Sequence, residues 1–287
     1  MQLWNLIQGD CRERLLDIES GTVQTCITSP PYWNLRNYGH GEQIGLEGSI
    51  EEYVDQMVTV FREVRRCLRE DGTLWLNLGD SYVNRQLVGM PWRVALALQS
   101  DGWILRSDII WHKPNPMPES TKNRPTRAHE YLFLLSASSQ YYYDAESIRE
   151  ADCGIPSGNS MQGRQGGSRG LPMSGGGGSS ERWTPGDGRN RRSVWTIVPS
   201  KERGFAATHF AVMPQALVEP CIKAGSRPYD LVLDPFAGAG TVLLEASRHK
   251  RNSIGIELNP ENVEICENRI RAWENTDESR QWALEGM

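Results

Sequence analysis

The octapeptide Asp234-Pro235-Phe236-Ala237-Gly238-Ala239-Gly240-Thr241 lies between a short apolar run and a stretch with helical spacing. This order predicts a strand, a tight glycine turn and a helix. The next apolar run begins at Ser253 and ends at Glu257, close to the roughly 20-residue spacing at which an acid binds a ribose in nucleotide-binding folds. The pattern therefore predicts the nucleoside-binding half of a Rossmann-like α/β fold.

The glycine turn differs from a dinucleotide-binding loop at one position. Gly238 and Gly240 match the first two glycines of the G-x-G-x-x-G pattern, whereas Leu243 stands at the third. A nucleoside ligand without a pyrophosphate fits this loss better than NAD does. Because a G-x-G alone also occurs in strand-to-helix turns that bind no ligand, the interpretation depends on the whole string together with Glu257.

Most of the chain on both sides of this turn alternates between strand-like and helix-like patterns, which is typical of a layered α/β sheet. Ser49 begins an S-x-x-E capping box, apolar residues then recur at helical spacing, and Asp71-Gly72 is expected to stop that helix. Asn259-Pro260 supplies the N-cap and first residue of a last helix. Strands are expected at residues 3–7, 23–28, 73–78, 103–111, 131–135, 230–233 and 253–257, and further helices at 91–99, 214–224 and from the glycine turn to about 250.

The composition sets limits on partners and location. The 287 residues carry a net charge of -5, so contact with nucleic acid requires a local basic patch. The six cysteines form no C-x-x-C pair and no His stands at metal-ligand spacing, which indicates buried, reduced thiols and no metal site. No basic leader and no apolar run near ~20 residues occurs, so we expect a cytosolic protein without membrane contact.

A segment of different composition, residues 136–203, interrupts the α/β pattern. Gly, Ser and Arg dominate it, and no strand or helix period persists. Arginines can contact phosphates or guanine edges, although a flexible linker fits the composition equally well. The position between two α/β halves favours recognition of nucleic acid. The residues expected to make these contacts are Arg182, Trp183, Arg189, Arg191 and Arg192, with Trp195 beside them.

A second turn, Thr28-Ser29-Pro30-Pro31-Tyr32-Trp33, follows the strand predicted at 23–28. The prolines stiffen the backbone and leave the Pro30 carbonyl without local N–H partners, so it can face outward as an acceptor. Ser29 adds a hydroxyl, and Tyr32 adds a flat ring. These groups suit a reaction at an aromatic amine, because acceptors on its N–H bonds localise the nitrogen lone pair while Tyr32 stacks on the base. A stiff turn without a ligand would also explain the two prolines.

The two turns together resemble the DNA amino-methyltransferases of restriction-modification and phage systems, in the permuted order that places the catalytic motif before the cofactor motif. The resemblance implies a Rossmann-like methyltransferase fold, S-adenosyl-L-methionine as cofactor, and Ser29, Pro30, Pro31 and Tyr32 as catalytic residues. It divides the chain into a catalytic half, a target-recognition insertion and a cofactor-binding half, at 1–135, 136–203 and 204–287. The cofactor-binding residues that it implies are Asp10, His209, Phe210, Asp234, Phe236, Gly238, Gly240, Thr241 and Glu257.

The resemblance implies a separate role for several of these residues. Gly9-Asp10 looks like the element near the adenine, and Glu257 like the ribose ligand. Residues 201–214, with His209 and Phe210, look like the segment that closes over the methionine end. Residues 71–80 match the strand that follows the catalytic loop.

The target base depends on Ser29. Family members with S-P-P-Y mostly methylate cytosine N4 and those with D-P-P-Y mostly adenine N6, so cytosine N4 is favoured; adenine stays open because a hydroxyl and a carboxylate both accept an N–H. The resemblance implies double-stranded DNA as partner, with the base flipped out of the helix, and leaves a cognate restriction endonuclease open. A DNA-binding relative without turnover and a methyltransferase acting on RNA or protein also stay open.

Overall fold

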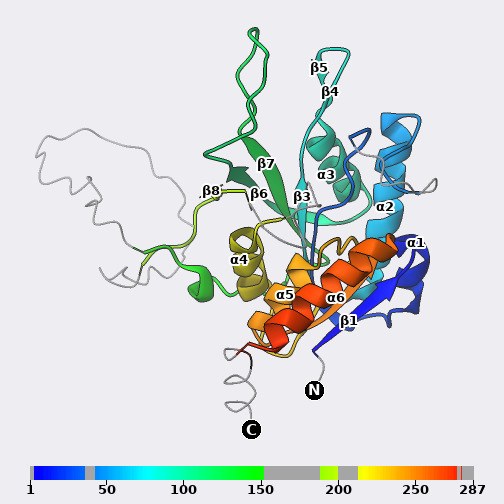
Figure 1. Cartoon of the computed structure of the whole chain (residues 1–287), viewed down its shortest axis with the longest axis vertical. Coiled ribbons are helices and arrows are strands. Elements are labelled where there is room, and N and C mark those ends of the chain that lie inside the picture. Colours follow the sequence, from blue (N-terminus) through cyan, green and yellow to red (C-terminus); the bar gives the residue numbers. More distant parts are fainter. Residues whose placement is uncertain (1–2, 36–42, 152–187, 200–212, 277–278, 280–287) are drawn as a thin grey trace, which may run out of the picture.

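An eight-stranded sheet forms the centre of the computed structural model, which describes residues 3–35, 43–151, 188–199, 213–276 and 279 (Figure 1). A separate short hairpin consists of β4 (Tyr82–Val83) and β5 (Gln86–Leu87). In the order in which they lie side by side, the strands of the main sheet are β1 (Trp4–Gln8), β10 (Asn252–Glu257), β9 (Leu231–Asp234), β2 (Val23–Thr28), β3 (Leu68–Leu78), β7 (His129–Ser136), β6 (Ile104–His112) and β8 (Val194–Thr196).

The strand directions bring the two predicted motifs to one edge. The five strands from β1 to β3 are parallel to their neighbours, β7 is antiparallel to β3 and β6, and β8 is parallel to β6. Because β9 pairs with β2, the C-terminal and N-terminal parts of the chain form one continuous sheet. The carboxyl ends of β9 and β2, where the glycine turn and the Ser29 turn begin, are therefore neighbours. This arrangement confirms the predicted Rossmann-like fold with permuted motif order.

Helices cover both faces of the sheet, because its central strands alternate their apolar side chains between the two faces. Leu74 and Leu76 of β3 belong to one core with α2 and α3, whereas Trp75 between them belongs to another core with α4 and α5. A third core joins β1, α5 and α6. The helices are α1 (Cys11–Arg14), α2 (Ile50–Cys67), α3 (Met90–Ser100), α4 (Gln215–Gly225), α5 (Thr241–Arg248) and α6 (Pro260–Glu274), with the 3₁₀ turns η1 (Leu15–Asp17) and η2 (Glu146–Ile148).

Two of the predicted helix starts are confirmed in detail. The Ser49 side chain accepts a hydrogen bond from the Glu52 backbone N–H at 3.2 Å, as an N-cap of α2 should. The Asn259 side chain accepts from the Glu261 N–H at 2.9 Å, and Pro260 occupies the first position of α6.

One boundary prediction was wrong. Helix α2 ends at Cys67, before Asp71-Gly72, and β3 begins directly at Leu68 with an irregular stretch opposite β2. Tertiary contacts explain the difference. The Asp71 carbonyl accepts from the Tyr142 N–H at 2.9 Å and the Gly72 carbonyl from the Ala137 N–H at 3.2 Å, so neighbouring chain segments hold these residues in extended backbone.

The edge strand β8 lies inside the segment whose composition predicts an insertion. Trp195 of β8 is 4% exposed, and its ring centroid lies 6.4 Å from that of Trp75 in the core. Trp195 therefore packs inside the protein, which corrects its place among the candidate recognition residues.

The described part of the chain also bears on the expectations from composition. Cys11, Cys26, Cys67, Cys221 and Cys266 are buried and free, whereas Cys153 lies outside the described residues. Within the same residues, no three His, Cys, Asp or Glu side chains gather as metal ligands. None of the helices described is long and apolar enough to cross a membrane.

Candidate active site

The glycine turn after β9 requires glycine for two different reasons. Gly238 has a φ of +52° and Gly240 a φ of +74°, a left-handed conformation that other residues adopt at a cost. A Cβ on Gly240 would also lie 2.1 Å from Cys266 Sγ of α6, whereas a Cβ on Gly238 would meet only the Phe236 carbonyl oxygen, at 3.9 Å. The turn thus packs closely against α6 at one glycine and stays open at the other.

The Glu257 carboxylate at the end of β10 is held by its neighbours. Its Oε2 accepts from the Gly238 N–H at 2.8 Å, and its Oε1 accepts from the Asn259 N–H at 2.8 Å and from Asn262 Nδ2 at 3.1 Å. A carboxylate has about four acceptor sites, so it can accept one further donor without losing these three. A ribose hydroxyl suits that fourth acceptor site, and a second hydroxyl would replace one of the three donors. The partly exposed side chain therefore suits a nucleoside.

Asp10 lies close to this carboxylate through the backbone. The Gly9 N–H donates to the Glu257 carbonyl at 2.9 Å, which places the end of β1 beside the end of β10. The Asp10 side chain accepts from the Arg12 N–H as the N-cap of α1 and forms an ion pair with the Arg12 guanidinium. Burial raises the pKa of Asp10, but the hydrogen bonds and charge of Arg12 outweigh it, so the net pKa is lowered.

Asp234 joins the cofactor turn to the catalytic turn. Its buried Oδ1 accepts from the Thr28 hydroxyl at 2.6 Å and from the Phe236 N–H at 3.1 Å. Burial raises the pKa of Asp234 to about 7, against the lowering effect of these two hydrogen bonds. Thr241, also predicted to bind the cofactor, is buried as the first residue of α5. A hydrogen bond therefore joins the last residues of β9 and β2, one from each motif.

The Ser29 turn leaves β2 at the same edge. The Pro31 carbonyl accepts from the Tyr53 hydroxyl of α2 at 2.9 Å. No donor among the described residues reaches the Pro30 carbonyl, and its role as an acceptor of the target amine stays a prediction. Ser29 is partly exposed and Pro30 is buried.

A network of polar side chains surrounds Ser29 and Tyr32. The Tyr32 hydroxyl donates to Glu130 Oε2 at 2.8 Å, and Ser29 Oγ donates to the Tyr32 oxygen at 3.4 Å. Asn77 Nδ2 lies 2.9 Å from Glu130 Oε2, 3.0 Å from Tyr32 Oη and 3.3 Å from Ser29 Oγ. Lys113 Nζ forms an ion pair with the other oxygen of Glu130. Five side chains thus form one connected group beside the catalytic turn.

Three members of this network were missed in the sequence. Asn77 is a polar residue between Leu76 and Leu78 in the apolar end of β3, and that interruption is the signal that could have identified it. Glu130 lies at the start of β7 beside His129, where the sequence pattern does not single it out. Lys113 follows β6 directly and stands before Pro114, in a segment that carries no motif of its own. Their meeting depends on the pairing of β7 with both β3 and β6.

The Tyr32 ring occupies a fixed position. A Cβ on Gly79, just after β3, would lie 2.6 Å from Tyr32 Cε2, so the ring rests against the Gly79 backbone. Burial, with the nearby charge of Glu130, raises the pKa of Tyr32 well above its usual range. The phenol therefore keeps its proton and remains a donor.

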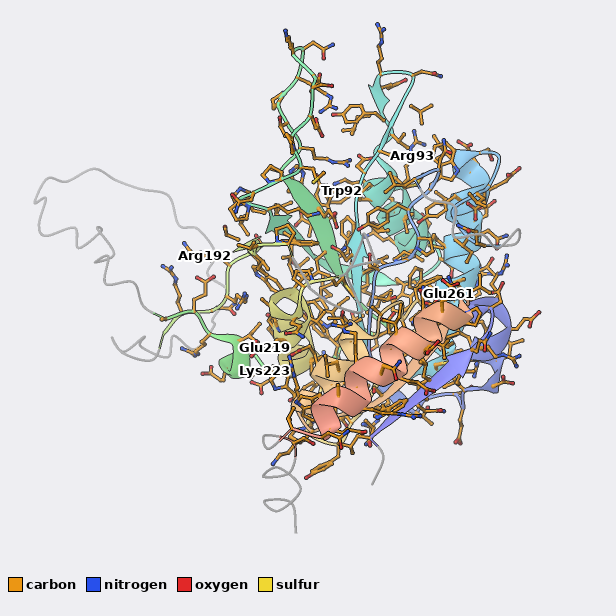
Figure 2. All side chains as sticks on the ribbon, viewed as in Figure 1. Trp92, Arg93, Arg192, Glu219, Lys223 and Glu261 are labelled. Atoms are coloured by element: carbon orange, nitrogen blue, oxygen red, sulfur yellow. The ribbon has the colours of Figure 1, made fainter. Side chains whose placement is uncertain are left out.

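The predicted DNA-contacting arginines that can be described already have partners within the chain. Arg189 and Arg192 form ion pairs with Glu150, at 3.2 and 2.9 Å, and the Arg191 guanidinium lies 4.4 Å from the centroid of the Trp195 ring. Figure 2 shows Arg192 at the side of the molecule where β8 joins the sheet. The predicted residues Arg182, Trp183, His209 and Phe210 lie outside the described residues.

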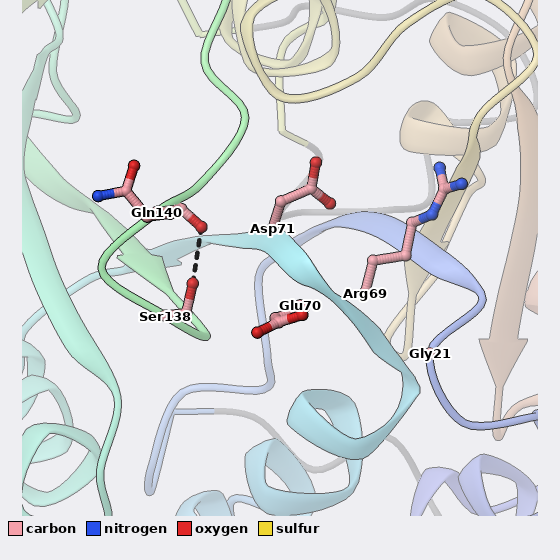
Figure 3. A pocket seen from close by; sticks show the side chains of 6 residues that line it. All are labelled: Gly21, Arg69, Glu70, Asp71, Ser138 and Gln140. Carbon is pink, nitrogen blue, oxygen red and sulfur yellow. Dashed lines mark hydrogen bonds between the residues drawn. The ribbon is translucent and has the colours of Figure 1, made fainter.

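A separate hollow lies at the opposite edge of the sheet, where β2 and β3 begin (Figure 3). Ser138 Oγ donates there to the Gln140 carbonyl at 2.6 Å. Both predicted motifs follow the carboxyl ends of their strands, so this hollow is not part of their site. Its lining residues are Gly21, Arg69, Glu70, Asp71, Ser138 and Gln140.

Known proteins resemble this chain over most of its length. The family model described as DNA methylase matches residues 23–268. The type II methyltransferase M.Cfr9I of Citrobacter freundii is 42% identical, over 93% of this chain and 87% of the relative; M.SmaI of Serratia marcescens is 41% identical, over 92% and 90%.

Solved structures show the same fold. The PvuII DNA methyltransferase, named as cytosine-N4-specific, superposes with a TM-score of 0.72 at 22% identity and covers 98% of this chain and 90% of its own. A DNA modification methylase of Thermus thermophilus, TTHA0409, solved with S-adenosyl-L-methionine, superposes with a TM-score of 0.63 at 26% identity, covering 93% of each chain.

Proposed function

This chain belongs to the DNA methylase family and is an S-adenosylmethionine-dependent DNA amino-methyltransferase, and we propose that its target is the N4 amine of cytosine in duplex DNA. The observation that carries the choice of base is the Ser29 hydroxyl at the end of β2, where an adenine-specific pattern would place a carboxylate. The PvuII enzyme, named for cytosine N4, has the same fold and supports this choice.

Each side of the sheet edge has its own part in the reaction. S-adenosylmethionine supplies an electrophilic methyl group when bound. Glu257 and the backbone around Gly238 and Gly240 hold its nucleoside. On the catalytic side, Ser29 Oγ and the Pro30 carbonyl accept the two N–H bonds of the target amine, which directs the nitrogen lone pair toward the cofactor side.

The base must leave the double helix to reach this edge, because its amine is not accessible inside the stack. Tyr32 provides the ring against which the flipped base stacks. The catalytic rate then depends mostly on positioning, since the methylated amine loses its extra proton readily.

We assign recognition of the DNA sequence to the insertion at 136–203, which lies between the catalytic half at 1–135 and the cofactor-binding half at 204–287. Arg189, Arg191 and Arg192 would exchange their internal partners for phosphates or base edges. Arg182 and Trp183 are the other two residues to which we assign DNA contacts. A cognate restriction endonuclease is the proposed partner, since the relatives are type II methyltransferases, and the cytoplasm is the proposed location.

The test is the chemical identity of the product. Purified protein is incubated with tritiated S-adenosylmethionine and DNA of varied sequence, and the nucleosides are separated by mass spectrometry. We expect N4-methylcytosine. N6-methyladenine would overturn the choice of base, and label in RNA or protein without label in DNA would overturn the substrate.

A further inference from the structure

We propose that Glu130 and Lys113 set the direction of the hydrogen bonds around Ser29, so that its hydroxyl faces the target amine as an acceptor. Neither residue need contact the substrate, so both are positioning residues. The inference rests on the proposed transfer to an exocyclic amine, and it holds for cytosine N4 and adenine N6 alike.

The need for such a device follows from the chemistry of serine. A carboxylate at position 29 would accept an N–H in any orientation, whereas a hydroxyl both donates and accepts. If the Ser29 hydrogen pointed outward, it would oppose the N–H of the amine and the contact would be repulsive. Something else in the site must therefore turn this hydrogen inward.

Glu130 is placed to do so as the common acceptor of the network. Its side chain is 15% exposed, and one oxygen accepts from both Tyr32 and Asn77 while the other is paired with Lys113. Both the backbone and the side chain of Lys113 have fixed neighbours. Its backbone N–H donates to the Ala128 carbonyl at 2.7 Å, and its Nζ lies 4.2 Å from the centroid of the Trp111 ring.

The order of donors then runs from Ser29 inward. The Tyr32 hydrogen is committed to Glu130, so the Tyr32 oxygen offers lone pairs to its other neighbours. Ser29 lies 3.4 Å from that oxygen and 3.3 Å from Asn77 Nδ2, and the latter is a donor only. Of these two contacts only the Tyr32 oxygen can accept, so the Ser29 hydrogen points inward and a lone pair faces out.

Because of Lys113, the order of hydrogen-bond donors from Ser29 through Tyr32 requires a carboxylate at position 130. In Glu130→Gln, the ammonium of Lys113 attracts the amide oxygen, so the amide NH₂ faces Tyr32 and Asn77. Tyr32 then accepts from the amide and its own hydrogen is free to point at Ser29, so the fixed order of donors is lost and the Ser29 hydrogen can turn outward. If Lys113 is also changed to Met, the amide can rotate, and its oxygen can again accept from Tyr32.

The experiment compares Glu130→Gln, Lys113→Met and the double variant with the unchanged protein. Methyl transfer from tritiated S-adenosylmethionine to DNA gives kcat and KM, and titration gives the cofactor Kd. We expect Glu130→Gln to lower kcat roughly 10²-fold, with DNA KM and cofactor Kd within about twofold. The double variant should recover roughly tenfold over Glu130→Gln.

The matched control is Glu119→Gln, which removes an ion pair with Arg124 in the same β6–β7 loop and should leave kcat unchanged. The proposal would be overturned if Glu130→Gln kept the kcat of the unchanged protein, or if the double variant had no higher kcat than Glu130→Gln. N4-methylcytosine made by the unchanged protein would still support the proposed function in either case. No methylated amine from the unchanged protein would overturn both. Thermal melting of each variant separates these outcomes from loss of fold.

Discussion

The candidate active site has a cofactor side, at the carboxyl end of β9, and a catalytic side, at the carboxyl end of β2. The two sides are built by different means. On the cofactor side, backbone N–H groups hold the Glu257 carboxylate, and the partner Gly238 is only 19 residues away in the chain. On the catalytic side, side chains hold side chains, and Tyr32 is 98 residues from its acceptor Glu130. A site made from local backbone tolerates changes in its neighbours, whereas a site made from distant side chains depends on every member.

The two sides are also joined by a hydrogen bond between side chains at the ends of their strands. The Thr28 hydroxyl, one residue before Ser29, donates to Asp234 at the start of the glycine turn. Substitutions can therefore test whether binding and transfer are separable and how much this junction contributes.

The largest expected effect separates transfer from binding. Ser29→Ala removes an acceptor of the target amine, and we expect kcat to fall roughly 10²- to 10³-fold. The cofactor Kd should stay within about twofold, because Glu257 and the glycine turn are unchanged. Single-turnover methylation and equilibrium titration of S-adenosylmethionine measure the two quantities.

Glu257→Ala is the opposite control. It removes the proposed ribose acceptor and should weaken cofactor binding about tenfold or more, while saturating cofactor restores much of the rate. If Ser29→Ala and Glu257→Ala both changed the Kd and the kcat equally, the division of the edge into two sides would be wrong.

The next effect is a pH dependence of stability at the junction. The pKa of Asp234 in the folded protein, about 7, lies above its ordinary value of 3.8. The folded protein therefore keeps this proton when the unfolded chain has lost it, and stability falls as pH rises through that window. Asp234→Asn cannot ionise, so the stability of the variant relative to the unchanged protein should rise by about 3 kcal/mol between pH 5 and pH 8.

Urea denaturation at the two pH values provides the measurement. The asparagine oxygen can still accept from Thr28 and Phe236, so the hydrogen bonds that end the two strands are retained. Parallel stability profiles for Asp234→Asn and the unchanged protein would show that this carboxyl titrates at its ordinary pKa.

The smallest effect concerns packing beneath the Tyr32 ring. In Gly79→Ala the new methyl group would displace the ring, and we expect kcat to fall roughly tenfold, since small displacements of reacting groups are costly. The matched control is Gly21→Ala at the opposite edge of the sheet, whose methyl meets no atom within 4 Å and whose left-handed φ of +71° costs stability by about 1 kcal/mol. Equal loss of kcat in both variants would mean that Gly79 does not act through Tyr32.

The accuracy of the sequence-based expectations follows the same division. The helix caps at Ser49 and Asn259 and the strand at 23–28 were predicted correctly, because periodicity and capping act over a few residues. The end of α2 was misplaced and Trp195 was placed among the candidate recognition residues, because β-sheet partners from distant segments decide both.

The sequence by itself determined the layered α/β architecture, the glycine turn and the proline-stiffened turn after β2. These depend on φ restrictions and on local hydrophobic periods, which neighbouring residues encode. Only the tertiary structure decided which polar side chains surround Ser29. Strand β7 lies between β3 and β6, out of chain order, and that pairing alone brings Asn77, Glu130 and Lys113 together.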